Sequence, residues 1–275
     1  MNVTAYIPHP ALQEFVINIA TIDATLPEGI GEVVTPYPPT PFQSLIFYCN
    51  DPVSMGLVKE NKFLKQPDIV LIGPQFSRVN IKVHKKLRSV RVDFYPGGMF
   101  RLLGLPMHEI FDIGLDAMDV FGTELKYINE QLKNSGNLHE AKNIVEQFLL
   151  SEVKKMRVLL PFDASMKVLL QNHGNISIEN AASYACLSLK QFERKCKERL
   201  GMNPKSYAKI LRFSKAYRLR EARPDLTWTE IACLSGYFDQ MHLIRDFKTF
   251  AGVNPSVIEQ QLLTTPLRMQ KDLPY

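Results

Sequence analysis

Two short segments near the C-terminus carry side chains that can form hydrogen bonds with the edges of nucleic-acid bases. An arginine can donate two hydrogen bonds to guanine O6 and N7, and a glutamine amide can pair with adenine N6 and N7. Both segments begin with a polar residue that can cap a helix, so their side chains fall in the first two turns, where a recognition helix meets base edges in the major groove. The residues predicted to face bases are Lys190, Gln191, Arg194, Gln240, His242 and Arg245.

Contacts with the nucleic-acid backbone are predicted for the residues around these six. The net charge of +5 is unevenly distributed: residues 164–275 contain 17 Lys and Arg against 10 Asp and Glu, whereas residues 1–163 contain 16 against 18. Within residues 188–223 the balance is 12 against 3. Such a cluster is typical of a surface that binds phosphate, although a solvated basic face without a partner has the same composition. The backbone candidates are Ser188, Lys195, Lys197, Lys205, Asp239 and Lys248.

An internal repeat places the two segments in equivalent positions. A shift of 51 residues superimposes the C-terminal region on itself and pairs Arg194 with Arg245. Repeats near this period usually mark duplicated supersecondary units. The same shift also makes these pairs: Ala181 with Ala232, Ala185 with Gly236, Lys197 with Lys248, Gly201 with Gly252, Asn203 with Asn254, and Pro204 with Pro255.

Each copy of the repeat is predicted to form two short helices joined by a tight turn. Ser177 and Thr227 are expected to cap the first helices, and Ser188 and Asp239 the second ones, because their side chains can accept hydrogen bonds from first-turn N–H groups. Helix, short turn and helix is the helix-turn-helix arrangement. The apolar residues of the second helices form one stripe in each copy: Leu189, Phe192, Cys196 and Leu200, then Leu243, Phe247 and Phe250.

The segment Lys205–Arg223 between the copies is predicted to form one long helix. Its residues Tyr207, Ile210, Leu211 and Tyr217 recur at helical spacing and are expected to pack inward. A rigid connector would hold the two second helices at a fixed separation. They could then enter successive major grooves on one face of a duplex, about 34 Å apart.

Residues 163–260 resemble the AraC-type family of regulators. The most specific stretch is Gly236–Pro255, GYFDQMHLIRDFKTFAGVNP, while the first copy departs from the pattern at Ala185 and Cys196. The resemblance implies a seven-helix bipartite module that binds double-stranded DNA and activates or represses promoters. It also implies RNA polymerase as a protein partner, and assigns the six residues named above to the bases.

The N-terminal region is predicted to be rich in β-structure, so that the whole chain belongs to the α+β class. Short apolar or alternating runs lie at residues 44–49, 68–72, 80–84 and 89–94. In the last run Val90, Val92 and Phe94 share one face. Gly and Pro turns between short strands favour a barrel-like domain. The stretch Val90–Pro106 resembles an uncharacterised sensor-like domain found ahead of some AraC-type modules, which implies trailing helices.

Three segments follow from these patterns. Residues 1–158 are predicted to form an effector or dimerisation domain with a helical subregion at about 119–157. After a linker around residues 159–163, residues 163–260 form the DNA-binding domain and 261–275 a C-terminal tail. A small-molecule effector and a homodimer both remain open. The absence of a signal sequence or an apolar run long enough for a membrane favours the cytoplasm.

No residues point to catalysis, so we predict a protein that is not an enzyme and has no cofactor or metal. The six histidines form no HxH or HExxH pair. Cys49 lies in an apolar run without neighbouring basic residues, which argues against a reactive thiolate. Two alternatives stay open. Residues 1–158 could be an enzyme-like domain, or they could serve only for dimerisation of a constitutive DNA-binding protein.

Overall fold

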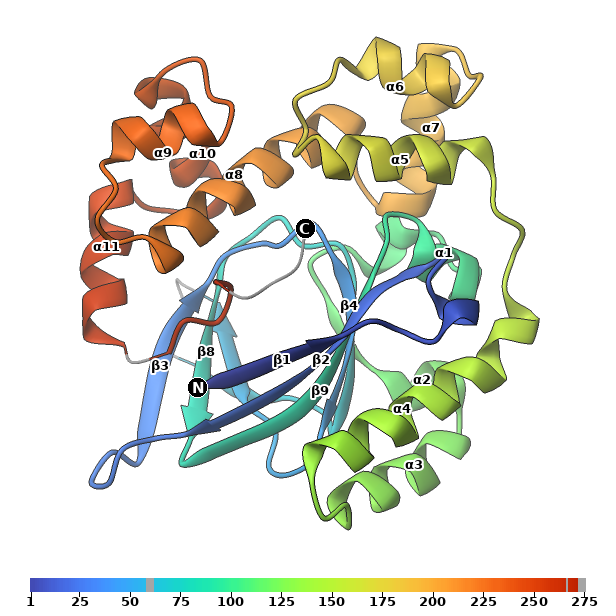
Figure 1. The fold of residues 1–275 in the computed structure, drawn as a ribbon, viewed down its shortest axis with the longest axis vertical. Helices are drawn as coiled ribbons and strands as arrows, with labels where there is room; N and C mark the ends of the chain where they lie inside the picture. Colours follow the sequence, from blue (N-terminus) through green and yellow to red (C-terminus); the bar gives the residue numbers. More distant parts are fainter. Residues whose placement is uncertain (58–61, 266, 272–275) are drawn as a thin grey trace.

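The computed structural model describes residues 1–57, 62–265 and 267–271. A strand-rich N-terminal part is followed by a helical C-terminal part, as Figure 1 shows. This arrangement confirms the predicted α+β class. The strands are β1 (Asn2–Tyr6), β2 (Val16–Thr25), β3 (Glu32–Tyr37), β4 (Gln43–Tyr48), β5 (Ser54–Leu57), β6 (Leu64–Lys65), β7 (Ile69–Ile72), β8 (Val79–His84), β9 (Lys86–Phe94) and β10 (Gly114–Asp116).

Two antiparallel sheets form the N-terminal part. The larger has the strand order β1-β2-β9-β4-β7-β10, and the smaller has the order β3-β8-β5-β6. Strand β9 lies between β2 and β4, and Val92 is paired with Ile19 on one side and Leu45 on the other. The four strands predicted from sequence are present as β4, β7, β8 and β9, but the pattern did not reveal β1, β2, β3, β5, β6 and β10.

The two faces of β9 have different surroundings. Val90, Val92 and Phe94 point to one side and join a buried apolar cluster with the helices that follow the sheet, which confirms their predicted common face. Ser89, Arg91 and Asp93 point to the other side, yet they too are buried, because the second sheet covers that face. The alternation of apolar and polar residues therefore separates two interiors, not an interior from solvent.

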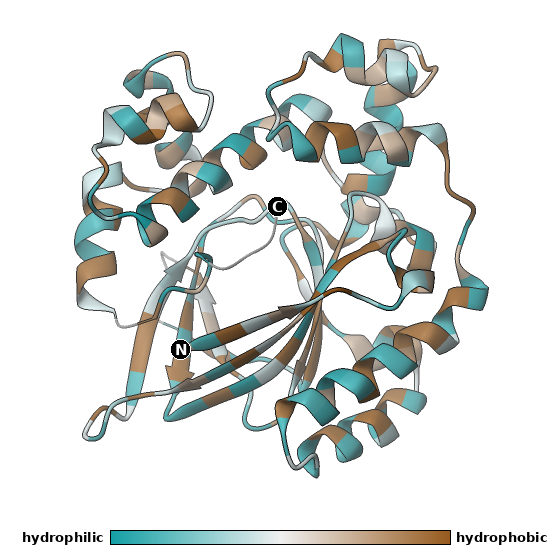
Figure 2. Cartoon of the chain, viewed as in Figure 1, coloured by the Kyte–Doolittle hydropathy of each residue, from teal (hydrophilic) through white to brown (hydrophobic). Residues whose placement is uncertain are grey.

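Helices cover the outer face of the large sheet. α1 (Gly98–Leu103) begins directly after the Pro96-Gly97 turn. α2 (Ala117–Phe121), α3 (Glu124–Lys133) and α4 (Leu138–Glu152) follow, and residues 134–137 separate the last two. Helix α4 buries Ala141, Val145, Phe148 and Leu149, and in Figure 2 hydrophilic (teal) segments alternate with hydrophobic (brown) ones along it. Short 3-10 helices occur at η1 (Pro10–Leu12), η2 (Met107–Ile110) and η3 (Val153–Lys155).

The C-terminal part consists of helices around a separate apolar core. In Figure 1 the long helix α8 spans between two groups of helices, α5 to α7 and α9 to α11. Helix α5 begins at Pro161, so the connecting segment is residues 156–160 and lies three residues before the predicted linker. The helices are α5 (Pro161–Gln171), α6 (Ile178–Tyr184), α7 (Leu189–Leu200), α8 (Pro204–Ala222), α9 (Trp228–Leu234), α10 (Gln240–Phe250) and α11 (Pro255–Thr264).

The two parts contact each other through the loop between β7 and β8. Phe76 packs on Phe250 with ring centroids 5.0 Å apart, and the Arg78 guanidinium donates to the Ala251 carbonyl at 3.4 Å. The same loop contributes Pro74, which lies against Gly201 at the end of α7. One loop of the N-terminal part therefore contacts the C-terminal ends of both α7 and α10.

Candidate nucleic-acid interface

The first helix-turn-helix unit is formed by α6 and α7. Ser177 Oγ accepts a hydrogen bond from the Asn180 N–H at 3.0 Å and caps α6. Ser188 caps α7 through a reciprocal pair of hydrogen bonds with Gln191. The helix ends at Leu200, and its C-cap Gly201 has a φ of +76°. Phe192, Cys196 and Leu200 are buried, but Leu189 is 39% exposed, so the predicted apolar stripe begins only at Phe192.

The second unit, α9 and α10, has the same plan. Thr227 caps α9 through a capping box with Glu230, and Asp239 Oδ1 caps α10 by accepting from the His242 N–H at 2.8 Å. Leu243, Phe247 and Phe250 are all buried. Helix α10 ends at Phe250, with Ala251 as its C-cap.

The two units are not related by a single shift of 51 residues. In the first unit the Leu187 N–H donates to the Ala182 carbonyl, and in the second the Tyr237 N–H donates to the Ala232 carbonyl. These bonds relate the first helices and the turns by 50 residues, whereas the second helices keep the shift of 51. The predicted pairing of Ala181 with Ala232 and of Ala185 with Gly236 is therefore wrong.

The difference of one residue comes from the turn of the second unit. Gly236 is equivalent to Cys186, and both have a positive φ, +80° and +55°. The turn then reaches the cap Asp239 through the additional residue Phe238, whose side chain is 92% exposed. The second unit thus presents an aromatic side chain beside α10 that has no counterpart in the first.

All six residues predicted to face bases lie on the surface of α7 and α10. Three of them already have local contacts. Gln191 Oε1 accepts a hydrogen bond from the Ser188 N–H at 3.0 Å, Gln240 Oε1 accepts one from the Thr229 hydroxyl at 3.4 Å, and His242 Nδ1 lies 3.2 Å from Asp239 Oδ1. Lys190, Arg194 and Arg245 have exposed side chains that extend from the helices.

The predicted backbone-contacting residues surround these two helices. Ser188 and Asp239 stand at the N-termini of α7 and α10, where N–H groups also favour a phosphate. Lys197, Lys205 and Lys248 are exposed. Lys195 is half-buried, because it lies next to Cys196 on the side of α7 that turns toward the protein. The structure thus brings five of the six to an open surface.

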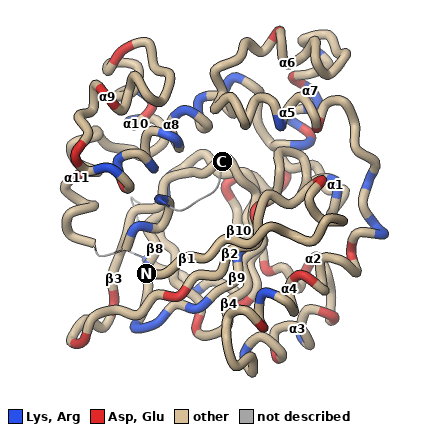
Figure 3. Tube along the Cα trace, in the orientation of Figure 1, with Lys and Arg blue, Asp and Glu red and all other residues tan. Residues whose placement is uncertain are grey.

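Helix α8 contributes Lys209 and Arg212, two basic residues that sequence reasoning missed, beside the predicted Lys205. Lys205 lines a groove together with Lys190, Arg194 and Lys197 of α7. Lys209 and Arg212 line a second groove together with His242 and Arg245 of α10. In Figure 3 blue segments follow α8 between the two units. The spacing of residues 205, 209 and 212 is the signal that could have revealed this surface, because steps of four and three keep side chains on one face of a helix.

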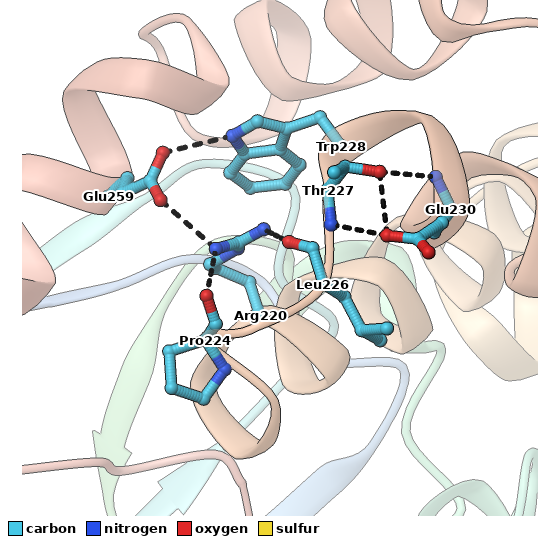
Figure 4. Close-up of polar contacts among 7 residues, drawn as sticks. All are labelled: Arg220, Pro224, Leu226, Thr227, Trp228, Glu230 and Glu259. Atoms are coloured by element: carbon cyan, nitrogen blue, oxygen red, sulfur yellow. Dashed lines mark hydrogen bonds and ion pairs between the residues drawn. The ribbon is translucent and has the colours of Figure 1, made fainter.

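A buried arginine fixes the second unit to α8. The Arg220 guanidinium donates to the Pro224 carbonyl at 3.1 Å and to Glu259 of α11 at 3.0 Å, and it also bonds the Leu226 carbonyl, as Figure 4 shows. It stacks over the Trp228 ring at 4.5 Å, while the indole N–H donates to Glu259 at 3.2 Å. These contacts hold α9 and α11 against the end of α8.

Nothing in the described residues suggests metal or thiol chemistry at this surface. Burial raises the pKa of Cys49 to about 11, so this thiol is protonated at neutral pH. No group of three or more His, Cys, Asp or Glu side chains in residues 1–57, 62–265 and 267–271 is arranged to hold a metal ion. Within the same residues, no helix has the length and apolarity needed to cross a bilayer.

Comparison with known proteins agrees with the geometry of the C-terminal part. Residues 181–261 match the family model described as "Helix-turn-helix domain". Residues 4–116 match the model described as "Domain of unknown function (DUF6597)". No curated protein matches the sequence significantly.

Several solved structures are similar to this chain. ToxT from Vibrio cholerae has 11% identity and a TM-score of 0.49 over 88% of this chain and 98% of its own. A second ToxT structure, from Vibrio cholerae O395, has 12% identity and a TM-score of 0.46 over 86% and 99%. A regulator from Chromobacterium violaceum, described as AraC-type, has 21% identity and a TM-score of 0.35 over 39% and 95%.

The family match and the geometry support the same assignment. The matched residues contain the end of α6 and all of α7 to α10, with two capped recognition helices whose polar residues are exposed. They confirm the resemblance seen in the sequence. The chain is a DNA-binding transcription regulator that combines an N-terminal domain of the DUF6597 type with a C-terminal AraC-type helix-turn-helix domain.

Proposed function

We propose that α7 and α10 enter two successive major grooves on one face of a DNA duplex. Lys190, Gln191, Arg194, Gln240, His242 and Arg245 would read bases. Ser188, Lys195, Lys197, Lys205, Asp239 and Lys248 would contact the backbone, joined by Lys209 and Arg212.

The observation that carries this proposal is the common face of α8. Lys205 borders the groove beside α7, and Lys209 and Arg212 border the groove beside α10. Because these three residues lie on one face of a single helix, both recognition helices open toward the same side. Helix α8 has 19 residues, and at 1.5 Å per residue it spans roughly 28 Å, close to the distance of about 34 Å between successive major grooves.

The N-terminal domain is proposed to regulate this binding. It contacts the ends of α7 and α10 through the loop that contains Pro74, Phe76 and Arg78. An effector that binds one arrangement of this contact better than another would shift the population of DNA-competent molecules. The proposal places the protein in the cytoplasm, with RNA polymerase as a partner at the promoter and a homodimer as one way to bind paired sites. It assigns no catalytic role to the domain.

DNA sites with altered spacing test the arrangement of the two recognition helices. A bound sequence is first selected from genomic fragments, and its two half-sites are located by footprinting. Insertion of five base pairs between them rotates one half-site to the opposite face of the duplex, so we expect the affinity to fall to that of a single half-site. Replacement of five central base pairs without insertion is the control and should have little effect. Equal affinity for the inserted and control sites would show that the two units do not bind one face.

A further inference from the structure

A cavity with about 60 Å³ of free space lies between the two sheets of the N-terminal domain. Its walls are mainly aliphatic and include Ile46, Val70, Ile81 and Leu87. Small-molecule sites combine apolar walls with a few polar groups, and displacement of the Met269 side chain, which lines this cavity, would enlarge it. Neither helix-turn-helix unit contributes to the lining, so the cavity is distinct from the DNA-binding surface.

One corner of the cavity is polar and carries hydrogen-bond donors. The Arg91 guanidinium, only 5% exposed, donates from Nη1 to the Tyr37 hydroxyl at 2.5 Å and from Nη2 to Ser44 Oγ at 3.1 Å. Because the Tyr37 oxygen accepts from Arg91, its own hydrogen can point to an acceptor in the cavity.

The positive charge of this corner is already balanced. Arg91 Nε lies 2.7 Å from Asp93 Oδ1, and the two side chains are 6% and 0% exposed. A negatively charged ligand would find no cation that is not already paired with Asp93, and its charged group would lose its hydration. The corner therefore favours a neutral molecule with a hydrogen-bond acceptor, such as a carbonyl, over an anion.

A described segment that follows α11 closes the mouth of the cavity. After α11, residues 267–271 return to the N-terminal domain, where Leu267 is 3% exposed and packs in the core between the sheets. Met269 lines the cavity itself. The Gln270 side chain donates to the Pro38 carbonyl at 2.7 Å, and its N–H donates to Glu221 Oε2 at 2.9 Å.

These contacts connect the cavity to the DNA-binding domain. Glu221 belongs to α8, which joins the two helix-turn-helix units, and Pro38 directly follows β3. On the opposite side, Gln75 lines the cavity and its neighbour Phe76 packs on Phe250 of α10. A molecule that changed the position of Met269 would therefore act on α8 through the hydrogen bond that the Gln270 N–H donates to Glu221.

We propose that residues 267–271 fill the mouth of the cavity when no ligand is bound. A neutral, mostly apolar molecule with one hydrogen-bond acceptor displaces Met269 and forms hydrogen bonds with Tyr37 and Arg91. Displacement frees Gln270 from Glu221 and so removes one link between α8 and the N-terminal domain. This inference rests on the proposed regulatory role of that domain. It adds the class of ligand and the segment with which the ligand competes.

The test uses the neutral fluorescent ketone prodan, whose emission shifts in apolar surroundings, as a probe of the full chain. If the tail competes for the site, Met269→Ala tightens prodan binding by about tenfold, because less of the protein is held in the closed form. Leu263→Ala removes an exposed apolar side chain from α11, a few residues before the segment 267–271. It is the matched control, and its affinity for prodan should be unchanged. Ile81→Trp fills the cavity and should abolish binding. If Met269→Ala binds prodan with unchanged or lower affinity, prodan does not compete with residues 267–271 and the proposal is wrong. The proposal is also wrong if Ile81→Trp still binds prodan.

Proteolysis gives a second readout that does not depend on a variant. Prodan should accelerate tryptic cleavage after Arg268, detected by mass spectrometry as loss of the C-terminal peptide. Slower cleavage would mean that the ligand secures the tail, and the proposal would be wrong. Tighter binding of the anion anilinonaphthalene sulfonate than of prodan would overturn the preference for a neutral ligand.

DNA affinity measured in the same samples separates this inference from the proposed function. If prodan competes with residues 267–271 but leaves the DNA affinity unchanged, competition between the ligand and this segment is supported, and the proposed regulatory role of the N-terminal domain is wrong. If prodan changes the DNA affinity of the wild type and of Met269→Ala equally, the regulatory role is supported, and the competition between ligand and segment is wrong.

Discussion

The two helix-turn-helix units share one plan but are held to the rest of the molecule by different chemistry. Position 199 at the end of α7 is equivalent to position 250 at the end of α10. In the first unit Arg199 forms a salt bridge of 2.7 Å with Asp163 of α5 and stacks over the Phe100 ring at 4.8 Å. In the second unit Phe250 packs on Phe76 and on Phe213 of α8, with ring centroids 5.0 and 5.2 Å apart.

This difference suggests unequal roles for the units. A buried ion pair is directional, and it becomes costly as soon as one partner moves away. An aromatic contact tolerates small displacements, because edge-to-face and offset geometries have similar energies. We therefore expect the first unit to keep a fixed position against α5 and the N-terminal domain, and the second to be the unit that shifts.

The largest effect is expected from Arg199→Ala. It leaves Asp163, which is 3% exposed, as an unpaired buried charge, so the free energy of unfolding should fall by about 3–5 kcal/mol. Urea denaturation followed by circular dichroism measures this loss. The double variant Arg199→Met with Asp163→Asn removes both charges, keeps an acceptor for the Leu160 N–H, and should recover most of the stability. A loss under about 1 kcal/mol for Arg199→Ala would place the pair among weak surface bridges and remove the contrast between the units.

Gly236→Ala probes the turn of the second unit and should cost about 2 kcal/mol. Gly236 has a φ of +80°, and the left-handed region alone costs an L-residue about 1–2 kcal/mol. An added Cβ would also lie 2.4 Å from the Asn175 side-chain nitrogen. Gly252→Ala is the matched control, since its φ is +70° and no atom lies within 4 Å of the added Cβ. Equal losses for the two variants would mean that Asn175 moves aside freely.

The turn also shows what the sequence could not reveal. Repeat, caps and apolar spacing located both units, because each of these signals lies within a few neighbouring residues. A single shift of 51 hid the insertion of Phe238, since the matches that define the shift come from α7 and α10. The hydrogen bonds of Leu187 and Tyr237 and the positive φ of both turn residues show that Cys186 is equivalent to Gly236, in agreement with the caps Ser177 and Thr227, which are 50 residues apart.

The cavity between the sheets could not be predicted from the sequence at all. Arg91 and Asp93 alternate with apolar residues, a pattern usual for a strand with one solvated face. Their burial depends on the second sheet, which pairs strands distant in the sequence, such as β3 with β8. The return of Leu267 to the N-terminal domain is a long-range contact of the same kind, without local signal.

Arg194→Ala and Arg245→Ala compare base reading by the two units. Each should weaken binding to the selected site by about 1–3 kcal/mol and relax the preference at one base position, because an arginine pair with guanine is specific. Fluorescence anisotropy on a set of single-base variants measures both effects. Lys85→Ala removes one exposed positive charge from the N-terminal domain and serves as the control. A uniform loss over all bases would assign that arginine to phosphate, and a loss for one arginine alone would mean that only one unit reads sequence.

The smallest effect, and the only gain, is expected at the turn of the first unit. Cys186 has a φ of +55° and an exposed side chain, so Cys186→Gly removes backbone strain without removing a buried contact. The free energy of unfolding should rise by about 1 kcal/mol. Cys233→Gly makes the same chemical change at another exposed cysteine, but within α9, where glycine should cost about 0.5–1 kcal/mol. Opposite signs for the two variants would establish that Cys186 occupies the glycine position of the motif. A loss at both would show that the first turn differs from the second in more than its length.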